Sequence, residues 1–596
     1  MGKIPSLLGP ADPLRFVSLL PSVQTGSEID AGIHIQGCDH GHNMVSLGGA
    51  PVYGATHLLG LFSVFNPAHF SRMTYATVAL QDGRLGGSML ITPYQDIPQA
   101  VKGDFSLGIM SASGSLRAPA GKNSAVGVSA RRSFLGLLYK PYLYIDDDPF
   151  RYDFDDFNLS WLWKPTSADT FSTELYFGSD KGVYTPYDAS ISVDSGWYNA
   201  VAVVNHTHSF GASLFRQRAY FTSYGCDAWV AKAASDKADL SSGISTLGYR
   251  GEFVKNQLFA GAEIQLHIAS PQRADRQNAL EGNLFAGSSY RADFNWSFSA
   301  FLKGGVYVNP QREAVLSLSP LLSARCDLFS RGSFELKSGL ATQNMFQTGV
   351  TSLGFPVEFW MLSDATRRPQ KSLFATLRYD REFLSGSYAL SAEVYVRRLY
   401  NQVEYSGTVL DVLFSSRTAG DLLTMGDGRN YGLNLMLHKQ AGALTGWISY
   451  ALARSLRRQG TSGPFFPSNY ERLHEVDIVA TYSAARWDAG CTLIAASGLP
   501  YTAPDALYIS GGQIICRYGP QNGARLAPYA RLDVSFNWYF TRRQGREHGL
   551  NLSLYNAFGR SNEISYKFVY TKDTFAYLPV SFSLRFMPGI GWFYRF

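Results

Sequence analysis

The segment from Arg531 to Phe540 alternates between apolar and polar side chains almost without a break. One parity holds the apolar side chains, which are Leu532, Val534, Phe536, Trp538 and Phe540. Successive side chains of a β-strand point to opposite faces, so this segment predicts a strand with one apolar and one polar face. The pattern recurs from about residue 105 to Phe596. Such repetition predicts the wall of a membrane β-barrel.

The composition agrees with a chain that lies partly in lipid. Hydrophobic residues make up 45% of the 596 residues, aromatic residues 14% and charged residues 17%, whereas soluble domains usually contain about 25% charged residues. The mean hydropathy is only −0.09, and no apolar run reaches the roughly 18 residues that a membrane helix needs. A large soluble all-β protein, such as a sandwich or a propeller, also alternates and remains an alternative on composition alone.

The connections between predicted strands favour the barrel. Further clean alternation occurs in residues 157–164, 171–177, 258–268, 390–397 and 433–438. Near the carboxyl end, a long loop extends to Asn469, a tight turn lies near Arg486, a long loop spans 499–528, and a short turn covers 542–548. Outer-membrane barrels sort their connections in this way, with long loops outside and short turns in the periplasm.

Length and the last strand refine this prediction. Ile590, Trp592, Tyr594 and Phe596 share one face, and such aromatic endings resemble the signal that barrel-assembly machinery recognises. About 500 residues of wall predict an all-β, antiparallel transmembrane barrel of about 22 strands. A lumen of that width is normally plugged. Residues 1–98, which are rich in Gly, Pro and His, are therefore the expected α+β plug, and residues 99–596 the expected barrel.

The net charge and the cysteines predict neither a nucleic-acid partner nor a disulfide framework. The net charge of +6 is small for this length, and no basic stripe with interleaved aromatics predicts a nucleic-acid partner. Five dispersed cysteines, Cys38, Cys226, Cys326, Cys491 and Cys516, do not form a disulfide framework. Residues 1–5 contain no apolar signal core, so we expect a misassigned start, a removed leader or a fragment.

Several clusters contain metal-ligating residue types. Cys38, His40 and His42 lie within five residues, near His34 and His57, but their spacing matches no closed zinc or copper site, and a polar loop near a ligand cavity is favoured. His206 and His208 share a strand face and are expected to face the lumen. An acidic group could hold Ca²⁺, although a solvated turn is favoured; its members are Asp146, Asp147, Asp148, Asp153, Asp155 and Asp156. No metal site or cofactor is therefore predicted.

Signatures of catalysis and of phosphate binding are missing from the sequence. Residues 83–87 contain Gly and Arg but lack the Lys and Ser/Thr of a phosphate loop. Neither a Gly-x-Ser-x-Gly elbow nor a His-Glu-x-x-His helix is present. We therefore predict no enzyme activity.

The first hundred residues resemble the plug of TonB-dependent outer-membrane receptors, especially of the Bacteroidetes type. The matching segments are Pro5–Gly9, Asp12–Arg15, Leu20–Gln24, Gly32–Gly37, Asn43–Leu47, Pro51–Tyr53, His57–Pro67 and Gly83–Leu85. Barrel segments similar to that family follow in the same order, namely Arg131–Phe134, Gly178–Lys181, Tyr431–Leu433, Gly446–Tyr450, Ser497–Thr502 and Arg531–Asp533. The resemblance covers nearly the whole chain.

The resemblance implies uptake of a scarce nutrient across the outer membrane, driven through a TonB complex. The cargo could be a siderophore, haem, cobalamin, a glycan or a peptide, bound by extracellular loops and the upper surface of the plug. Outer-membrane lipid and a surface lipoprotein are further expected partners. The chain departs from the family at Gln36-Gly37, where an Arg-Gly is usual, and at Gly48-Gly49, where an Asp-Gly is usual. These departures, and the lack of a TonB-contacting segment before Met1, favour the alternative of a non-transporting binding or assembly scaffold.

Overall fold

The computed structural model describes most of residues 12–596. The ranges that it leaves undescribed within that span are 27–31, 58–59, 61, 135–143, 146–147, 185–191, 232–236, 273, 329–330, 349–358, 406–418, 511–512, 544, 572–573 and 582–585. Within the described part, no helix is both long and apolar enough to cross a membrane.

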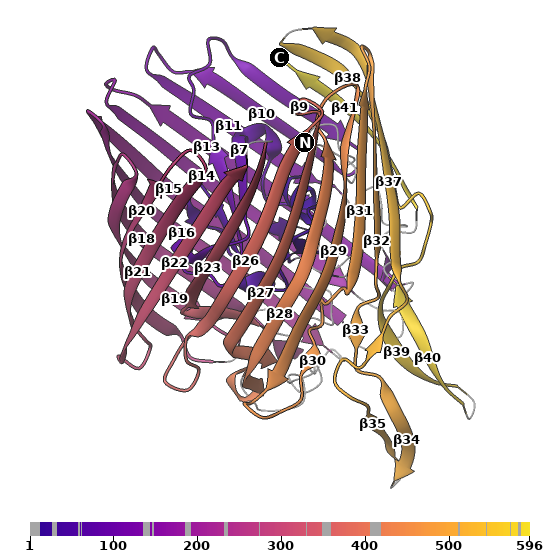
Figure 1. The fold of residues 1–596 in the computed structure, drawn as a ribbon. Helices are drawn as coiled ribbons and strands as arrows, with labels where there is room; N and C mark the ends of the chain where they lie inside the picture. Colours follow the sequence, from indigo (N-terminus) through magenta and orange to yellow (C-terminus); the bar gives the residue numbers. More distant parts are fainter. Residues whose placement is uncertain are drawn as a thin grey trace.

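The described residues form a closed antiparallel barrel of 22 strands (Figure 1). Its strands are β9 (Lys102–Gly108), β10 (Ser111–Pro119), β11 (Ser124–Ser133), β13 (Asp148–Trp163), β14 (Asp169–Tyr184), β15 (Ser192–Phe210), β16 (Ser213–Ala231), β18 (Ser242–Lys255), β19 (Leu258–Ser270), β20 (Gln277–Arg291), β21 (Trp296–Val308), β22 (Ala314–Leu328), β23 (Gly332–Gln343), β26 (Gln370–Phe383), β27 (Tyr388–Tyr405), β28 (Leu423–Lys439), β29 (Leu444–Gln459), β31 (His474–Ser483), β32 (Trp487–Ala496), β37 (Tyr529–Arg543), β38 (Arg546–Tyr555) and β41 (Met587–Arg595). Pairing of β41 with β9 closes the barrel, which confirms the predicted fold class.

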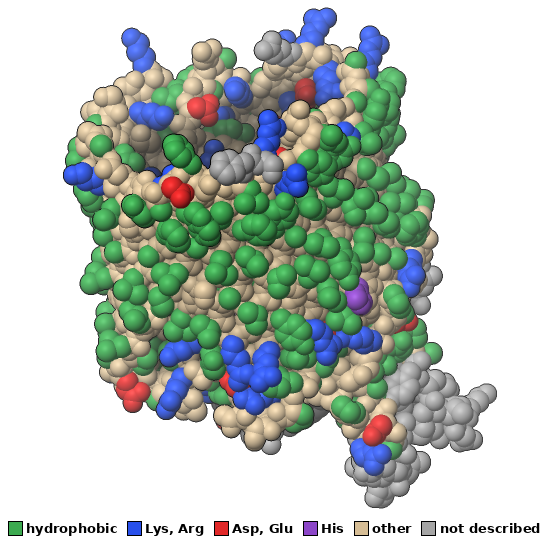
Figure 2. Space-filling model, viewed as in Figure 1, with side chains coloured by type: hydrophobic (Ala, Val, Ile, Leu, Met, Phe, Trp, Pro, Cys, Tyr) green, Lys and Arg blue, Asp and Glu red, His purple; other side chains and the backbone are tan. Residues whose placement is uncertain are grey.

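Side-chain parity assigns the two faces of the wall. In β37, Trp538 and Phe540 are 46% and 55% exposed, whereas Asp533 and Tyr539 between the apolar positions are buried. Apolar side chains thus point outward and polar side chains point into the barrel, as the alternation predicts. Figure 2 shows the resulting apolar band across the face of the outer wall that it views, with Lys and Arg gathered at both rims. A closed barrel with such a band is an outer-membrane protein.

The connections sort by length between the two ends of the barrel. Turns such as 211–212, 256–257, 292–295 and 484–486 lie at the end where the chain terminates, whereas the described parts of the connections 344–369, 460–473, 497–528 and 556–586 lie at the opposite end. Residues 109–110 and 309–313 are short exceptions at that second end. Short turns face the periplasm in such barrels, so we refer to the periplasmic and extracellular ends accordingly. The predicted alternation of long loops and short turns is confirmed, although β37 and β38 extend into the expected 542–548 turn.

Short elements complete the long connections. They include the small strands β12 (Tyr144–Ile145), β17 (Lys237–Asp239) and β30 (Phe466–Pro467) and the 3-10 helix η5 (Ala419–Leu422). Two-stranded sheets also lie in these connections. They pair β24 (Met345–Thr348) with β25 (Phe359–Leu362), β33 (Pro500–Tyr501) with β36 (Ala524–Arg525), β34 (Pro504–Ser510) with β35 (Gln513–Tyr518), and β39 (Glu563–Thr571) with β40 (Thr574–Ser581). The pairs β34–β35 and β39–β40 extend beyond the extracellular end of the wall (Figure 1).

The described part of residues 12–93 lies inside the barrel as a plug (Figure 1). Its elements are α1 (Pro13–Ser18), β1 (Val23–Gln24), β2 (His34–Ile35), η1 (His40–His42), β3 (Met44–Leu47), β4 (Ala50–Pro51), β5 (Thr56–His57), β6 (Phe62–Ser63), η3 (Pro67–His69), β7 (Phe70–Ala76), η4 (Leu80–Asp82) and β8 (Ser88–Pro93). The central sheet has the order β4-β3-β8-β7. Asp12 caps α1 by accepting from Leu14 N at 2.9 Å, and its second oxygen accepts from Ser63 N at 2.6 Å, which ties α1 to β6.

The plug sheet is separate from the wall. Among the described residues, no plug strand pairs with a barrel strand, because the plug strands form sheets of their own. Apolar packing joins the two parts instead: Val45, Ile35 and Met89 of the plug share a cluster with Tyr176 and Val203 of the wall. Side chains, and not a shared β-ladder, therefore hold the plug.

Candidate functional site

The interface between plug and wall contains a buried histidine held by two carboxylates. His57 Nε2 lies 2.8 Å from Asp156 Oδ1 on β13, and His57 Nδ1 lies 2.8 Å from Asp180 Oδ1 on β14. Arg131 on β11 donates to Asp156 Oδ2 from Nε at 2.7 Å and to the carbonyl of Ser63 at 2.6 Å. Tyr176 donates to Asp156 at 2.8 Å. This His57 cluster connects the plug strands β5 and β6 to three wall strands.

Two neighbouring carboxylates control the charge of His57. Burial of the ring by itself lowers the pKa, but Asp156 and Asp180 outweigh it and raise the pKa of His57 from 6.5 to about 9. The imidazolium form is therefore the stable one at neutral pH, and both ring nitrogens donate. Phe154 stacks on the ring at 4.3 Å between centroids, which fixes its plane.

A second polar contact centres on Gln36. Arg397 on β27 donates to Gln36 Oε1 from Nε at 3.0 Å and from Nη2 at 2.6 Å, and it also donates to the carbonyls of Leu85 and Thr77. The amide nitrogen of Gln36 donates to Glu393 Oε1 at 2.7 Å. An amide can accept and donate at once, so glutamine satisfies a cation and an anion together. The arginine expected by family resemblance would place two guanidinium groups side by side here.

A third contact joins residues 37–39 of the plug to the extracellular half of β29. Arg457 lies 3.5 Å from Asp39 Oδ2 and donates to the carbonyl of Gly37 at 3.2 Å. Burial would raise the pKa of Asp39, but Arg457 outweighs it and lowers that pKa. Burial lowers the pKa of His42 to about 4, so its neutral Nδ1 accepts from the N–H of Asp39 at 3.2 Å. His34 stacks on Tyr470 of an extracellular loop at 3.8 Å.

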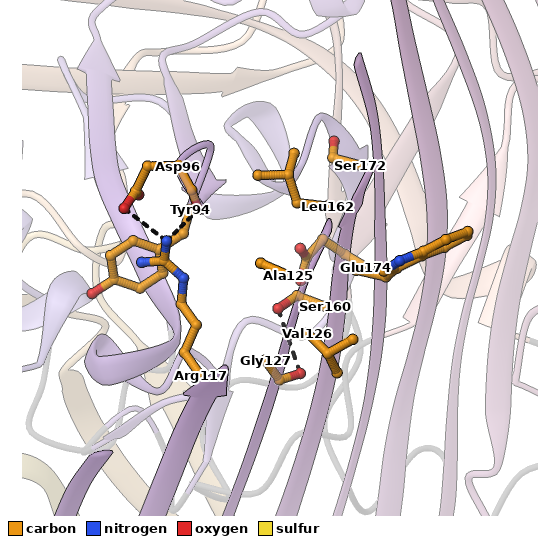
Figure 3. A pocket seen from close by; sticks show the side chains of 11 residues that line it. Tyr94, Asp96, Arg117, Ala125, Val126, Gly127, Ser160, Leu162, Ser172 and Glu174 are labelled. Carbon is orange, nitrogen blue, oxygen red and sulfur yellow. Dashed lines mark hydrogen bonds and ion pairs between the residues drawn. The ribbon is translucent and has the colours of Figure 1, made fainter. Parts of the chain in front are cut away.

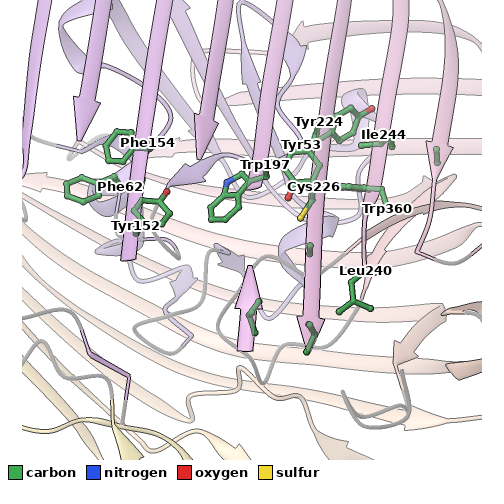
Figure 4. Close-up of a cluster of buried hydrophobic side chains, with 14 of the residues drawn as sticks. Tyr53, Phe62, Tyr152, Phe154, Trp197, Tyr224, Cys226, Leu240, Ile244 and Trp360 are labelled. Carbon is green, nitrogen blue, oxygen red and sulfur yellow. The ribbon is translucent and has the colours of Figure 1, made fainter. Parts of the chain in front are cut away.

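A hairpin from the extracellular end packs inside the barrel against the plug. Strands β24 and β25 belong to the 344–369 connection, yet Phe346, Phe359 and Met361 are almost fully buried. Trp360 packs edge-on against Tyr53 of the plug at 5.1 Å, and Arg84 lies over its ring at 4.9 Å. Figure 4 shows these rings within a larger aromatic cluster whose members include Phe62, Tyr152, Phe154, Trp197 and Tyr224. The hairpin thus occludes the plug from the extracellular side.

Replacing Gly41 with alanine is expected to displace this hairpin. A Cβ at Gly41 would lie 2.7 Å from Gln347 Cβ on β24, and such overpacking costs about 1–3 kcal/mol. Hydrogen exchange measured by mass spectrometry should become faster in residues 345–348 and 359–362. Gly282→Ala in β20 is the matched control because its Cβ would meet nothing within 4 Å. Unchanged exchange in the Gly41 variant would contradict the packing.

The linker from plug to barrel is fixed near the periplasmic end. Arg117 on β10 lies 2.8 Å from an Asp96 carboxylate oxygen and 4.2 Å from the centre of the Tyr94 ring. These side chains border a cavity of about 10 Å³, room for about one water molecule, with Ser160 and Glu174 on its far wall (Figure 3). The point where the chain passes from plug to wall is therefore a fixed attachment.

A larger cavity separates the plug from the wall on another side. It has a volume of about 320 Å³ and lies between Gln81 of the plug and the periplasmic parts of β18 to β22. Its lining includes Asn256, Gln257, Ser288, Ser289 and Phe301. Figure 2 shows the barrel hollowed at this end. The plug therefore fills the lumen incompletely on the periplasmic side.

The structure separates several residues that the sequence grouped. His57 lies in the cluster with Asp156 and Asp180, away from Cys38, whereas His34 and His40 contact each other edge-on at 5.9 Å. Cys38, Cys226, Cys326 and Cys491 are free thiols. Among the described residues, the Cys38, His40 and His42 group does not bring three ligand atoms together.

Two expectations are wrong. His206 and His208 face outward and not into the lumen, because they share the parity of Val204, which is 44% exposed on the outer wall. The acidic group is not a solvated turn: Asp153, Asp155 and Asp156 lie within β13, where Asp155 faces outward and Asp156 inward. Asp146 and Asp147 fall outside the described residues, and nothing is described of the Asp148 side chain.

Comparison with known proteins identifies the fold. No model of a known protein family matches the sequence, and no curated protein matches it. The structure is similar to the siderophore receptor PirA from Pseudomonas aeruginosa, with 12% identity, a TM-score of 0.65, and coverage of 98% of this chain and 96% of PirA. The chain has the plug-and-barrel fold of TonB-dependent siderophore receptors.

Two further structures show the same extent of similarity. The iron transporter FrpB from Neisseria meningitidis matches with 12% identity and a TM-score of 0.70, over 98% of this chain and 96% of FrpB. The ferric-catecholate import receptor Fiu from Escherichia coli K12 matches with 11% identity and a TM-score of 0.65, over 97% and 93%. All three are receptors or transporters by name, and none is an enzyme.

Proposed function

We propose that this protein is an outer-membrane receptor that takes up a scarce nutrient, with a ferric siderophore as the first cargo class to test. The observation that carries the proposal is a wide barrel closed by a plug that shares no strand pairing with the wall among the described residues. A plug held by side chains can move without breaking the hydrogen-bond ladder of the barrel. The names of the similar structures support siderophores as the cargo class.

The proposed binding region lies beneath the β24–β25 hairpin. Tyr53, Trp197 and Tyr224, which do not belong to the hairpin, offer flat apolar surfaces. Arg84, which lies over the Trp360 ring of the hairpin at 4.9 Å, would be left as a cation beside them. Such a combination suits an aromatic, anionic ligand, because rings stack and the guanidinium attracts negative charge. Cargo would displace the hairpin, and force applied through TonB would then release the plug from the His57, Gln36 and Arg457 contacts.

The cavity beside Gln81 supports the second half of this cycle. Space already exists between plug and wall at the periplasmic end, so a limited movement of the plug would extend it towards the binding region. TonB and the cargo are therefore the proposed partners, and a surface lipoprotein remains a further proposal.

The test uses a deletion strain of the native host, complemented with the full gene. Under iron limitation, growth on a panel of ferric siderophores, haem and cobalamin should be lost with the deletion for one cargo class and restored by the gene. Uptake of radioactive iron with that cargo should also require an intact TonB system. Uptake that persists without TonB, or no loss of growth on any member of the panel or on glycans and peptides, would argue for the non-transporting scaffold.

A further inference from the structure

Three side chains that can bind a metal converge on the outer wall at the periplasmic end. Asp169 opens β14, and His206 and His208 lie near the end of β15. Asp169 pairs across the strands with His208, and Phe171 pairs with His206, so all three ligand residues share one face. Their side chains are 22%, 21% and 42% exposed, respectively. Solvent therefore reaches the group.

The geometry of this group is close to that of a metal shell. Asp169 Oδ1 lies 2.7 Å from His208 Nδ1 and 3.0 Å from His206 Nε2, and all three ligand atoms lie within 4.8 Å of one another. In a tetrahedral zinc site, bond lengths near 2.1 Å separate neighbouring ligand atoms by about 3.4 Å. Opening these two contacts by about 0.7 Å and 0.4 Å, to the spacing of about 3.4 Å, would therefore admit the ion.

Neighbouring side chains already orient the ligands. Thr166 Oγ1 donates to Asp169 Oδ2 at 2.7 Å, which leaves Oδ1 directed at the imidazoles. Gln217 contacts His206 Nδ1 at 3.2 Å and accepts from the Tyr249 hydroxyl at 2.7 Å. Rotation of the Gln217 amide by 180° would let its oxygen accept from a protonated Nδ1, which is the state that a metal on Nε2 requires.

Aromatic stacking fixes the planes of both rings. Phe171 lies parallel to His206 at 4.2 Å between centroids, and Phe210 stacks on His208 at 5.6 Å. Trp163 packs on Phe171 at 5.4 Å, so the group belongs to the row of outward aromatic residues near the periplasmic rim. Because these side chains are already held in place, they lose little conformational entropy when an ion binds, and this strengthens the binding.

We propose that Asp169, His206 and His208 bind one divalent transition-metal ion, Zn²⁺ first, on the outer wall at the periplasmic rim. Two imidazoles and one carboxylate form a three-residue set whose fourth position stays open to water. The carboxylate of Asp169 also supplies a negative charge, which attracts a dication. The ion would join β14 to β15 beyond their backbone ladder. This site is independent of the proposed uptake.

The experiment measures Zn²⁺ binding to the full chain, purified in detergent without a polyhistidine tag, by isothermal titration calorimetry. We expect one Zn²⁺ per chain, and a visible absorption band of tetrahedral Co²⁺ when cobalt replaces zinc. His208→Ala and Asp169→Asn should each weaken binding by about 100-fold or more. Thr166→Val removes the hydroxyl that donates to Asp169 Oδ2 and accepts from the N–H groups of Ala168 and Asp169, and it should weaken binding by about 10-fold. Unboiled gel mobility confirms that each variant retains the barrel.

His548→Ala is the matched control. His548 also lies among wall aromatics, near Phe540 and Trp592, and among the described residues it belongs to no group of three metal-ligating side chains. Its zinc affinity should equal that of the unchanged protein. Absence of saturable binding would overturn the proposal. Binding that survives His208→Ala at full affinity would also overturn it, because the ion would then occupy another site, such as the thiol of Cys326 or Cys491.

Discussion

Replacement of His57 with leucine is expected to loosen the plug by about 3–5 kcal/mol, the usual effect of removing one partner from a buried ion pair. Asp156 would keep Arg131 and Tyr176, but Asp180 would lose the imidazolium that faces it at 2.8 Å. The remaining carboxylate would be buried with too little positive charge nearby. A loss of this size raises the population of undocked plug by at least about 100-fold.

Planar-bilayer conductance measures this population directly, since a barrel of 22 strands without its plug is a wide pore. The His57→Leu variant should show frequent large openings, and cells that carry it should become sensitive to large antibiotics that the outer membrane normally excludes. His548→Leu is the control, because His548 contacts wall aromatics and not the plug. Equal opening rates for both variants and the unchanged protein would show that the His57 cluster does not hold the plug.

The same cluster predicts a pH dependence of plug docking. The pKa of His57 is raised from 6.5 to about 9 in the docked state, so the docked plug binds this proton more tightly than a released plug does. The resulting stabilisation is fully present below about pH 6.5 and is lost as the pH rises through about 9. Openings should therefore become more frequent between pH 7 and pH 10, whereas the His57→Leu variant should lack this change. A wild-type opening rate that is constant over this interval would contradict the assignment.

Patterns of period two predicted the wall because membrane and lumen impose opposite demands on neighbouring residues. Asp533 and Trp538 illustrate this: one is 6% exposed inside the barrel and the other 46% exposed outside. The contacts between the plug and the wall could not be predicted from this alternation. His57 and Asp156 are 99 residues apart, and a single sequence carries no signal for such a pairing.

The polar character of a residue does not always predict which face of the wall it lies on, as His206 and His208 show. A polar residue in a barrel strand normally faces the lumen, yet His206 and His208 lie outside, where Phe171 and Phe210 stack on them. Near the rim the outer face meets headgroups and water, so polar and aromatic side chains coexist there. Val204 lies two residues before His206, has the same parity and is exposed on the outer wall. Extending the alternation from this apolar residue would have assigned both histidines to the outer face. The inward fold of the β24–β25 hairpin had no such signal, because its apolar residues resemble those of any strand.

Replacement of Arg397 with leucine is expected to release the middle of the plug, with an effect comparable to that of the His57 change. The guanidinium makes four hydrogen bonds to the plug, two to Gln36 Oε1 and one each to the carbonyls of Leu85 and Thr77. Bonds to a charged donor contribute about 1.5–3 kcal/mol each, and buried acceptors without a donor add a cost of their own. We therefore expect a loss of about 3–5 kcal/mol, since wall and plug can relax in part.

The next residue in the strand provides a matched control. Arg398 faces outward, donates to Asp427 at 3.3 Å and is 28% exposed, so Arg398→Leu removes the same charge without touching the plug. Arg397→Leu should raise the rate of large conductance openings and lower the melting temperature of a plug transition in calorimetry, whereas Arg398→Leu should change neither. Arg397→Lys should give an intermediate result, because one ammonium cannot reach Gln36, Leu85 and Thr77 together. If the lysine variant has the opening rate and the melting temperature of the unchanged protein, the positive charge alone, and not the several N–H donors of the guanidinium, holds Gln36. In that case the glutamine would no longer be explained by its pairing with Arg397 and Glu393.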